Sequence, residues 1–142
     1  MKQIYHSSSP QETEAFAKAL GETLKGGEVI AFRGSMGAGK TCFVRGLAEG
    51  MGVSGEVCSP TFALVHEYRG AINLYHFDMY RIHDVDDLYS TGYFDYLEDD
   101  SSVLAIEWSE QMEDALPDNL IVVTIEAEGE NLRVITVERE GE

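Results

Sequence analysis

A glycine-rich segment from residue 34 to residue 41 carries the clearest chemical signal in the sequence. It reads Gly-Ser-Met-Gly-Ala-Gly-Lys-Thr and matches the pattern G-x-x-x-x-G-K-[S/T] at every fixed position. Glycines let the backbone wrap closely around an anion, and the amide groups of the loop and of a following helix point at that anion. We expect Lys40 to reach the β and γ phosphates and the Thr41 hydroxyl to bind Mg²⁺. The segment predicts a site for a magnesium nucleotide.

The rest of the sequence favours ATP over GTP as that nucleotide. The chain lacks the Asn-Lys-x-Asp of guanine-binding proteins, and Asp78-Met79-Tyr80-Arg81 does not give the Asp-x-x-Gly of a GTPase switch. Small-molecule kinases usually close an arginine-bearing lid over the transferred phosphoryl group, whereas the six arginines of this chain are scattered. We therefore expect ATP and Mg²⁺ as cofactors, with a small-molecule phosphotransferase as an alternative.

Two acidic residues are candidates for holding Mg²⁺ and orienting the attacking group, because each ends a predicted strand. Glu107 follows the apolar run Val103 to Ile106, and Asp78 ends the strand that contains Leu74 and His76. A P-loop enzyme needs acids at strand ends near its phosphate-binding loop. An acid just after a buried strand is also often a purely structural one.

Other residues have both a chemical and a plain structural interpretation. Thr61, in the rigid turn Ser59-Pro60-Thr61, could sense the γ-phosphate, although an ordinary turn is the commoner role. Trp108 is more often core or interface filler than a platform for a base. Cys42 follows the glycine-rich segment inside a predicted helix, where packing is the usual role. The histidines at positions 66, 76 and 83 are isolated in the sequence, and we expect core or surface positions for them.

The elements that must position these residues follow from hydrophobic periodicity and from turn and cap signals. Ser9-Pro10-Gln11-Glu12 has capping-box spacing, with Pro at the first helical position. We expect helices over 10–25 and 39–51, helical segments within 84–100, and strands over 28–33, 62–68, 72–77, 103–108, 120–127 and 132–137. Helices between the early strands and a late hairpin predict an α/β fold with a mixed sheet and helical layers.

Length and charge narrow the class of protein. The 142 residues predict one domain spanning 1–142. Ten basic against 26 acidic residues give a formal charge of −16, so binding of phosphate backbones without a basic partner is improbable. We see no secretory or transit segment and no apolar run of membrane-spanning length. Cys42 and Cys58 fit reduced thiols, which indicates a cytoplasmic protein.

Four motifs together resemble the bacterial TsaE (YjeE) family in order and spacing. They are Gly37-Ala38-Gly39-Lys40-Thr41, Ser59-Pro60-Thr61-Phe62, the run from Tyr75 to Arg81, and Ile106-Glu107-Trp108. The resemblance extends from the first helix to about Arg133. It departs at Ser35, where members commonly have Asp, and at Cys42, where a second Thr is common.

The resemblance implies a Mg²⁺-dependent ATPase, weak alone and activated by partners, that assists formation of threonylcarbamoyladenosine beside the anticodon of tRNAs reading codons that begin with A. The family acts with a heterodimer of the TsaD transferase and its TsaB paralogue, and ATP turnover resets that complex rather than forming the product bond. We therefore expect TsaB and TsaD homologues as partners, tRNA contact only through the complex, and no membrane. The family fold is a P-loop NTPase-like three-layer fold, a parallel core sheet flanked by antiparallel strands and helices.

Carried over residue by residue, the resemblance assigns the following roles. Lys40 binds phosphates, Thr41 and Glu107 coordinate Mg²⁺, Thr61 acts in the switch, Asp78 supports hydrolysis and Trp108 lies near the site. The residues expected around the nucleotide are then Gly37, Ala38, Gly39, Lys40, Thr41, Cys42 and Trp108, with Ser9, Gln11, Thr13 and Arg133 as candidates for base or ribose contacts. A nucleotide-dependent binding switch with incidental hydrolysis stays open as a second kind of function.

Overall fold

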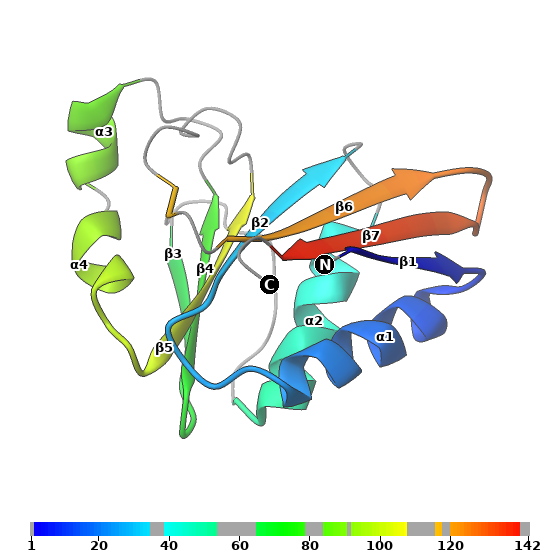
Figure 1. Cartoon of the computed structure of the whole chain (residues 1–142), viewed down its shortest axis with the longest axis horizontal. Helices are drawn as coiled ribbons and strands as arrows, with labels where there is room; N and C mark the ends of the chain where they lie inside the picture. Colours follow the sequence, from blue (N-terminus) through cyan, green and yellow to red (C-terminus); the bar gives the residue numbers. More distant parts are fainter. Residues whose placement is uncertain are drawn as a thin grey trace.

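One mixed β-sheet organises the part of the chain that the structure, a computed structural model, describes (Figure 1). The described residues are 2–34, 39–53, 65–78, 84–90, 92–107, 116–117 and 120–139. Within them the strands are β1 (Lys2–Ser7), β2 (Val29–Gly34), β3 (Val65–Tyr68), β4 (Asn73–Asp78), β5 (Ser102–Glu107), β6 (Ile121–Ala127) and β7 (Arg133–Arg139). The helices are α1 (Pro10–Glu22), α2 (Lys40–Met51), α3 (Val85–Ser90) and α4 (Tyr93–Leu97).

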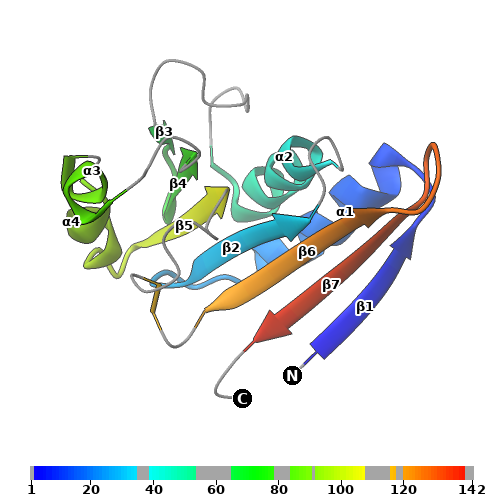
Figure 2. The ribbon, with the colours of Figure 1, turned by 90° about the horizontal axis from the view of Figure 1, so that it is seen from above.

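The strand order is β1-β7-β6-β2-β5-β4-β3, seen from above in Figure 2. The four central strands, β6, β2, β5 and β4, run parallel to one another, and β3, β7 and β1 are antiparallel to their neighbours. The centre is the most apolar part, since the first four residues of β2 and the first five of β5 are buried. Strands buried on both faces are typical of a parallel sheet covered by helices. The expected parallel core with antiparallel flanks is confirmed.

Helices cover both faces of the sheet and give three layers (Figure 1). Helices α1 and α2 pack on one face, over a cluster that includes Phe32, Leu74 and Ile125. On the other face the aromatic side chains of α4 pack on a second cluster, and the ring centroids of Tyr93 and Phe77 lie 6.0 Å apart. The described part of the chain therefore has two apolar cores, one on each face of the sheet.

Helices α1 and α2 touch through their backbones because glycines line the contact. A Cβ at Gly46 would collide with the carbonyl oxygen of Glu14, and one at Gly50 with the carbonyl oxygen of Lys18. A Cβ at Gly21 on α1 would likewise collide with the carbonyl oxygen of Leu47. The two helices are thus fixed against each other at close range.

The predicted cap at the start of α1 is present. The Ser9 side chain accepts a hydrogen bond from the Glu12 amide at 3.1 Å, and Pro10 occupies the first helical position. The Glu12 carboxylate in turn accepts from the Ser8 hydroxyl at 2.6 Å. A buried contact of 2.7 Å between the hydroxyl groups of Ser7 and Thr13 ties the end of β1 to the helix. The start of α1 is therefore held firmly at one end of the sheet.

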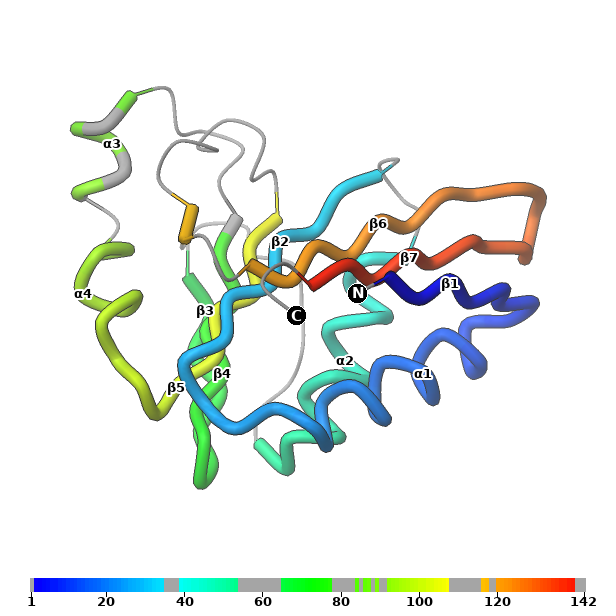
Figure 3. The backbone as a smooth tube through the Cα atoms, in the orientation of Figure 1, coloured from blue at the N-terminus to red at the C-terminus, as the bar shows by residue number. Residues whose placement is uncertain are grey.

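The structure differs from the sequence prediction mainly at the N-terminus. Strand β1 was not predicted, because four of its six residues are exposed and it lacks a clear alternating pattern. It forms by antiparallel pairing with β7, so that the first and last strands of the chain lie side by side (Figure 3). Helix α1 ends at Glu22 rather than Lys25, because Thr23 caps it by donating from its hydroxyl to the Leu20 carbonyl at 2.6 Å.

Other boundaries shift by one to three residues. The predicted hairpin across Arg69-Gly70-Ala71 is confirmed as antiparallel β3 and β4, and the late hairpin as β6 and β7. The start of the strand expected over 62–68 lies outside the described residues. None of the described helices, the longest of which has 13 residues, has the length and apolar character needed to cross a membrane.

Candidate nucleotide-binding site

The phosphate-binding segment joins strand β2 to helix α2, as its sequence predicts. Gly34 ends β2 with a φ of 117°, and a Cβ there would collide with the carbonyl oxygen of Ile125 on β6. Only glycine fits both constraints. Gly39 has a φ of 105° and forms the N-cap of α2. Both described ends of the segment thus show why this pattern needs glycine, while residues 35–38 lie outside the description.

Lys40 and Thr41 open helix α2. Lys40 is buried, with 8% of its surface exposed, and the first turn of α2 contains no acidic residue. A helix N-terminus carries a partial positive charge, and a lysine ammonium adds to it. Positive charge concentrated at a buried strand-to-helix junction suits an anion such as a nucleotide phosphate. The described part of the segment therefore fits the ligand that its sequence predicts.

Two acidic residues lie at the carboxyl ends of neighbouring parallel strands. Asp78 is the last residue of β4, Glu107 is the last residue of β5, and the two are register partners. Strand β5 also pairs in parallel with β2, from which the phosphate-binding segment leaves. Carboxyl ends of parallel strands share one edge of a sheet, which is where ligands of such folds bind. The backbone therefore brings both predicted acids to the edge at which α2 begins.

Glu107 has a partner that the sequence did not reveal. Its Oε2 lies 2.6 Å from Nε2 of His76, and the Glu107 side chain is 12% exposed. His76 is fully buried, which agrees with the expected core or surface position, and although it is isolated in the sequence it contacts Glu107 in the fold. The two residues are 31 positions apart, and only the pairing of β4 with β5 brings them together.

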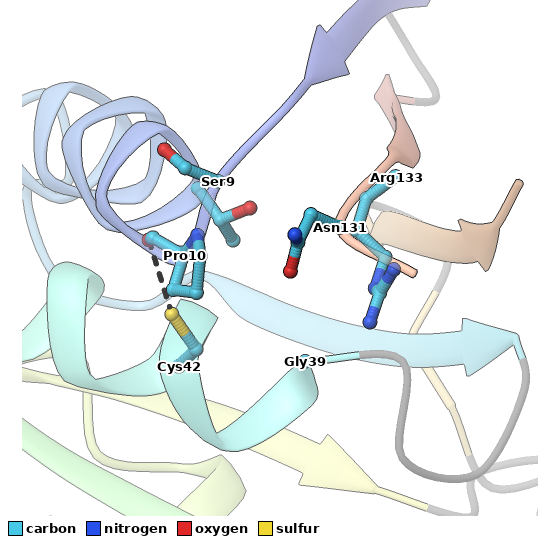
Figure 4. Close-up of a pocket in the computed structure, with 7 residues that line it drawn as sticks. Ser9, Pro10, Gly39, Cys42, Asn131 and Arg133 are labelled. Atoms are coloured by element: carbon cyan, nitrogen blue, oxygen red, sulfur yellow. Dashed lines mark hydrogen bonds between the residues drawn. The ribbon is translucent and has the colours of Figure 1, made fainter. Parts of the chain in front are cut away.

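A pocket lies beside the start of α2, and Figure 4 shows its walls. Ser9 and Pro10 form one side, Asn131 from the β6–β7 turn and Arg133 from the start of β7 face them, and Gly39 lies between. Thr13 and Cys42 complete the lining. Because Gly39 belongs to the phosphate-binding segment, this pocket adjoins that segment. Of the candidates for such contacts, the exposed Gln11 does not line the pocket.

Arg133 organises the turn that forms the far wall. Its Nη1 donates to the carbonyl oxygens of Gly129 at 3.1 Å, Glu130 at 3.4 Å and Leu132 at 2.9 Å. Asn131 lies inside that turn and lines the pocket, a residue that sequence reasoning missed. The sequence predicts that Asn131 lies in the turn Gly129-Glu130-Asn131. It does not predict the pairing of β7 with β1, which brings this turn close to α1.

Cys42 has the properties of a packed, unreactive thiol. Its Sγ donates to the carbonyl oxygen of Pro10 at 3.3 Å, which links α2 to the start of α1. Burial raises the pKa of the Cys42 thiol, the charge of Glu14 raises it further, and Arg45 opposes both. The thiol therefore stays protonated at neutral pH.

Several predicted residues lie outside the described part of the chain. They are Gly37, Ala38, Thr61 and Trp108, together with the side chain of Asp78. Their roles stay predictions. The described residues that the fold gathers at this end of the sheet are Ser9, Thr13, Gly39, Lys40, Thr41, Cys42, Glu107 and Arg133.

Comparisons with known proteins agree on one family. Residues 7–135 match the family model described as "Threonylcarbamoyl adenosine biosynthesis protein TsaE". The chain is 37% identical to a Treponema pallidum protein over 84% of this chain and 87% of that one, and 38% identical to a Bacillus subtilis protein over 92% and 82%. Both relatives are named tRNA threonylcarbamoyladenosine biosynthesis protein TsaE.

A solved structure extends the likeness to three dimensions. The crystal structure of Bacillus subtilis YdiB superimposes with a TM-score of 0.78 at 31% identity, covering 99% of this chain and 87% of that one. The family match covers the phosphate-binding segment, both strand-end acids and the pocket. By sequence and by fold, this chain belongs to the TsaE family.

Proposed function

We propose that this chain is a Mg²⁺-dependent ATPase subunit required for threonylcarbamoylation of the adenosine next to the anticodon, in tRNAs that read codons beginning with A. The observation that carries the proposal is the junction of β2 and α2, where a phosphate-binding sequence meets the carboxyl end of β5 with Glu107. Relatives named for tRNA threonylcarbamoyladenosine biosynthesis support the pathway.

In this proposal each residue of the site has its own role. Lys40 binds the β and γ phosphates, the Thr41 hydroxyl and Glu107 hold the ion, and Asp78 supports hydrolysis. Held there, Mg²⁺ would supply positive charge against the negative charge that develops during phosphoryl transfer. Thr61 acts as the switch residue that responds to the γ-phosphate.

The lining of the pocket is compatible with an adenine base. Asn131 offers a carboxamide, with both a donor and acceptors, beside the apolar ring of Pro10. Donor and acceptor side by side suit the edge of an adenine ring. The absence of guanine-binding motifs from the sequence points the same way.

The partners in this proposal are homologues of TsaB and TsaD, acting as a heterodimer, and tRNA meets the chain only through that complex. ATP binding and hydrolysis reset the complex and do not form the product bond. Exposed acids at and around α3 and α4, such as Asp86, Asp95 and Glu98, suit a basic partner surface. Complex formation should weaken as salt rises from low to physiological strength, because salt screens such contacts. If the affinity for the partners did not change with salt, the acidic surface would not be part of the docking site.

The deciding experiment measures ATP turnover by the purified chain with Mg²⁺, alone and with the TsaB–TsaD pair from the same source. Strong stimulation that Lys40→Ala abolishes and that Lys25→Ala, an exposed lysine, leaves intact would support the proposal. ATP binding without stimulation would favour a nucleotide-dependent binding switch. An ADP burst that depends on a small acceptor would favour a phosphotransferase. Equal tRNA modification by Lys40→Ala would contradict the proposal outright.

A further inference from the structure

A fully buried histidine contacts the acid at the end of β5. The Nε2 atom of His76 and the Oε2 atom of Glu107 are 2.6 Å apart, which is short for a hydrogen bond to a nitrogen. The two residues sit on neighbouring parallel strands, where His76 is the register partner of Ala105. Glu107 is two residues further along β5, so the contact runs diagonally across the strand pair. Two rigid strands at the centre of the sheet fix this contact.

Both side chains project to the face of the sheet that carries α2. Side chains alternate between faces along a strand. Leu74 and Ala105 belong to the core cluster beneath α1 and α2. His76 and Glu107 each follow one of them by two residues and so share that face. The pair therefore lies on the side of the helix that starts with the proposed phosphate and magnesium ligands.

The surroundings of the ring select its tautomer. A carboxylate only accepts hydrogen bonds, so the contact with Glu107 requires a proton on Nε2. The other ring nitrogen, Nδ1, is buried and has no hydrogen-bond partner among the residues that the structure describes. An unpaired lone pair is tolerated in an interior more readily than an unpaired N–H group. These surroundings favour the tautomer with the proton on Nε2 and a lone pair on Nδ1.

Burying a polar ring at this position costs free energy, whereas an apolar side chain would fill the core without any polar atom that needs a hydrogen bond. The presence of a histidine here therefore calls for an explanation. Glutamate is a long side chain that loses rotamer freedom when it is held. A hydrogen bond to one carboxylate oxygen removes that freedom before any ligand arrives. It also commits Oε2 and leaves Oε1 as the oxygen available for another contact. Such partners of metal-binding side chains commonly set the affinity for the ion.

We propose that His76 is a positioning residue that holds Glu107 through Oε2, so that Oε1 is presented to the magnesium nucleotide. The role rests on the proposed function, because it takes Glu107 as a ligand of Mg²⁺. His76 itself touches neither ion nor substrate. Its effect is confined to the orientation of one carboxylate.

The first test needs no ligand. Nitrogen-15 NMR of the histidine rings in the nucleotide-free chain should show one ring with a protonated Nε2 and an unprotonated Nδ1. That signal should disappear in His76→Gln and shift in Glu107→Gln. A ring protonated on Nδ1 alone, or a signal that ignores Glu107→Gln, would overturn the proposal.

The second test uses two variants that differ by one methylene. The amide nitrogen of His76→Gln reaches the position of Nε2, whereas that of His76→Asn stops at the position of Nδ1. A fluorescent ATP analogue bound to the chain is titrated with Mg²⁺, and the Mg²⁺ concentration that gives half of the fluorescence change is measured. This concentration should rise about 10- to 100-fold in His76→Asn and stay within about threefold of the unsubstituted value in His76→Gln. Affinity for the analogue without Mg²⁺ should be unchanged in both.

A double substitution separates positioning from general damage to the core. Adding His76→Asn to Glu107→Gln should not weaken the Mg²⁺ response beyond that of Glu107→Gln alone, because interacting residues are not additive. Additive losses, or an unchanged Mg²⁺ response in His76→Asn, would overturn the role of His76 alone. An unsubstituted chain that binds the analogue without any effect of Mg²⁺ would instead overturn the proposed function, and the positioning role with it.

Discussion

Asp78 and Glu107 are direct partners in the register of β4 and β5, and each is the last residue of its strand. The pairing puts two acids at one position along the sheet edge, next to the strand that leads into the phosphate-binding segment. Two carboxylates at one level repel each other unless a cation or a donor lies near. His76 supplies a donor to Glu107. The proposed function requires a divalent ion at this edge.

Removing the charge of Glu107 should separate catalysis from docking. We expect Glu107→Gln to lower Mg²⁺-dependent ATP turnover with the partner pair by about 10- to 100-fold, because a neutral amide is a poor Mg²⁺ ligand. Affinity for the partners should change much less. Steady-state ADP release and a pull-down at fixed salt would measure both, with Glu138→Gln, an exposed acid on β7 outside the proposed docking surface, as the control. Equal loss of turnover and docking would contradict the assignment.

The glycine contact between α1 and α2 should be sensitive to a single methyl group. Gly50→Ala places a Cβ against the Lys18 carbonyl oxygen, so the free energy of unfolding should fall by about 1–3 kcal/mol despite the better helix propensity of alanine. In Gly129→Ala the nearest atom to the new Cβ is 3.7 Å away, on Leu132, and the change should stay within about 0.5 kcal/mol. Urea unfolding of both variants measures this. An unchanged Gly50→Ala would mean that the helices can separate at no cost.

Cys42 should report occupancy of the pocket. Its raised pKa leaves little thiolate at pH 8, so iodoacetamide should modify it several times more slowly in the folded chain than in the urea-unfolded chain. Because Cys42 lines the pocket, ATP with Mg²⁺ should slow the reaction further. Mass spectrometry of the peptide that contains Cys42 follows the rate. If ATP did not change the rate at which iodoacetamide modifies Cys42, the nucleotide would not bind in this pocket.

Tyr93 should make the chain sensitive to alkali. Burial raises the pKa of Tyr93 from its ordinary value of 10.0 to about 12. The unfolded chain therefore loses the proton first, and the stabilisation is complete below pH 10 and is lost as pH rises towards 12. Between pH 9 and 11 this loss is about 1 kcal/mol, and Tyr93→Phe should remove it. Urea unfolding at both pH values tests this, with the exposed Tyr89→Phe expected to behave like the unsubstituted chain.

The sequence predicted the elements that local signals specify. The pattern around Lys40 predicted a strand-to-helix junction, and the apolar run before Glu107 predicted a buried strand with an acid at its end. Cap and turn residues such as Ser9 and Gly70 predicted most of the boundaries. These features depend on residues close in the chain, and periodicity and turn chemistry describe them well.

The remaining features depend on pairing between distant segments. His76 looked isolated because its partner is 31 residues away, and only the β4–β5 register shows the contact. Asn131 reaches the pocket only after β7 pairs with β1, a strand with no pattern of its own. The glycines at 46 and 50 lie within the helix predicted over 39–51, and nothing close to them in the chain shows that they are contact points with α1. A single sequence carries no direct record of such long-range neighbours.

The glycine contact also determines how binding energy spreads through the molecule. The pocket has walls at the starts of α1 and α2, and those helices meet backbone to backbone. A ligand that binds only the folded form stabilises every segment that must open to release it. We expect helices so joined to exchange their amide hydrogens largely through a common opening. A ligand held at the start of α2 should therefore slow hydrogen exchange along α1 as well.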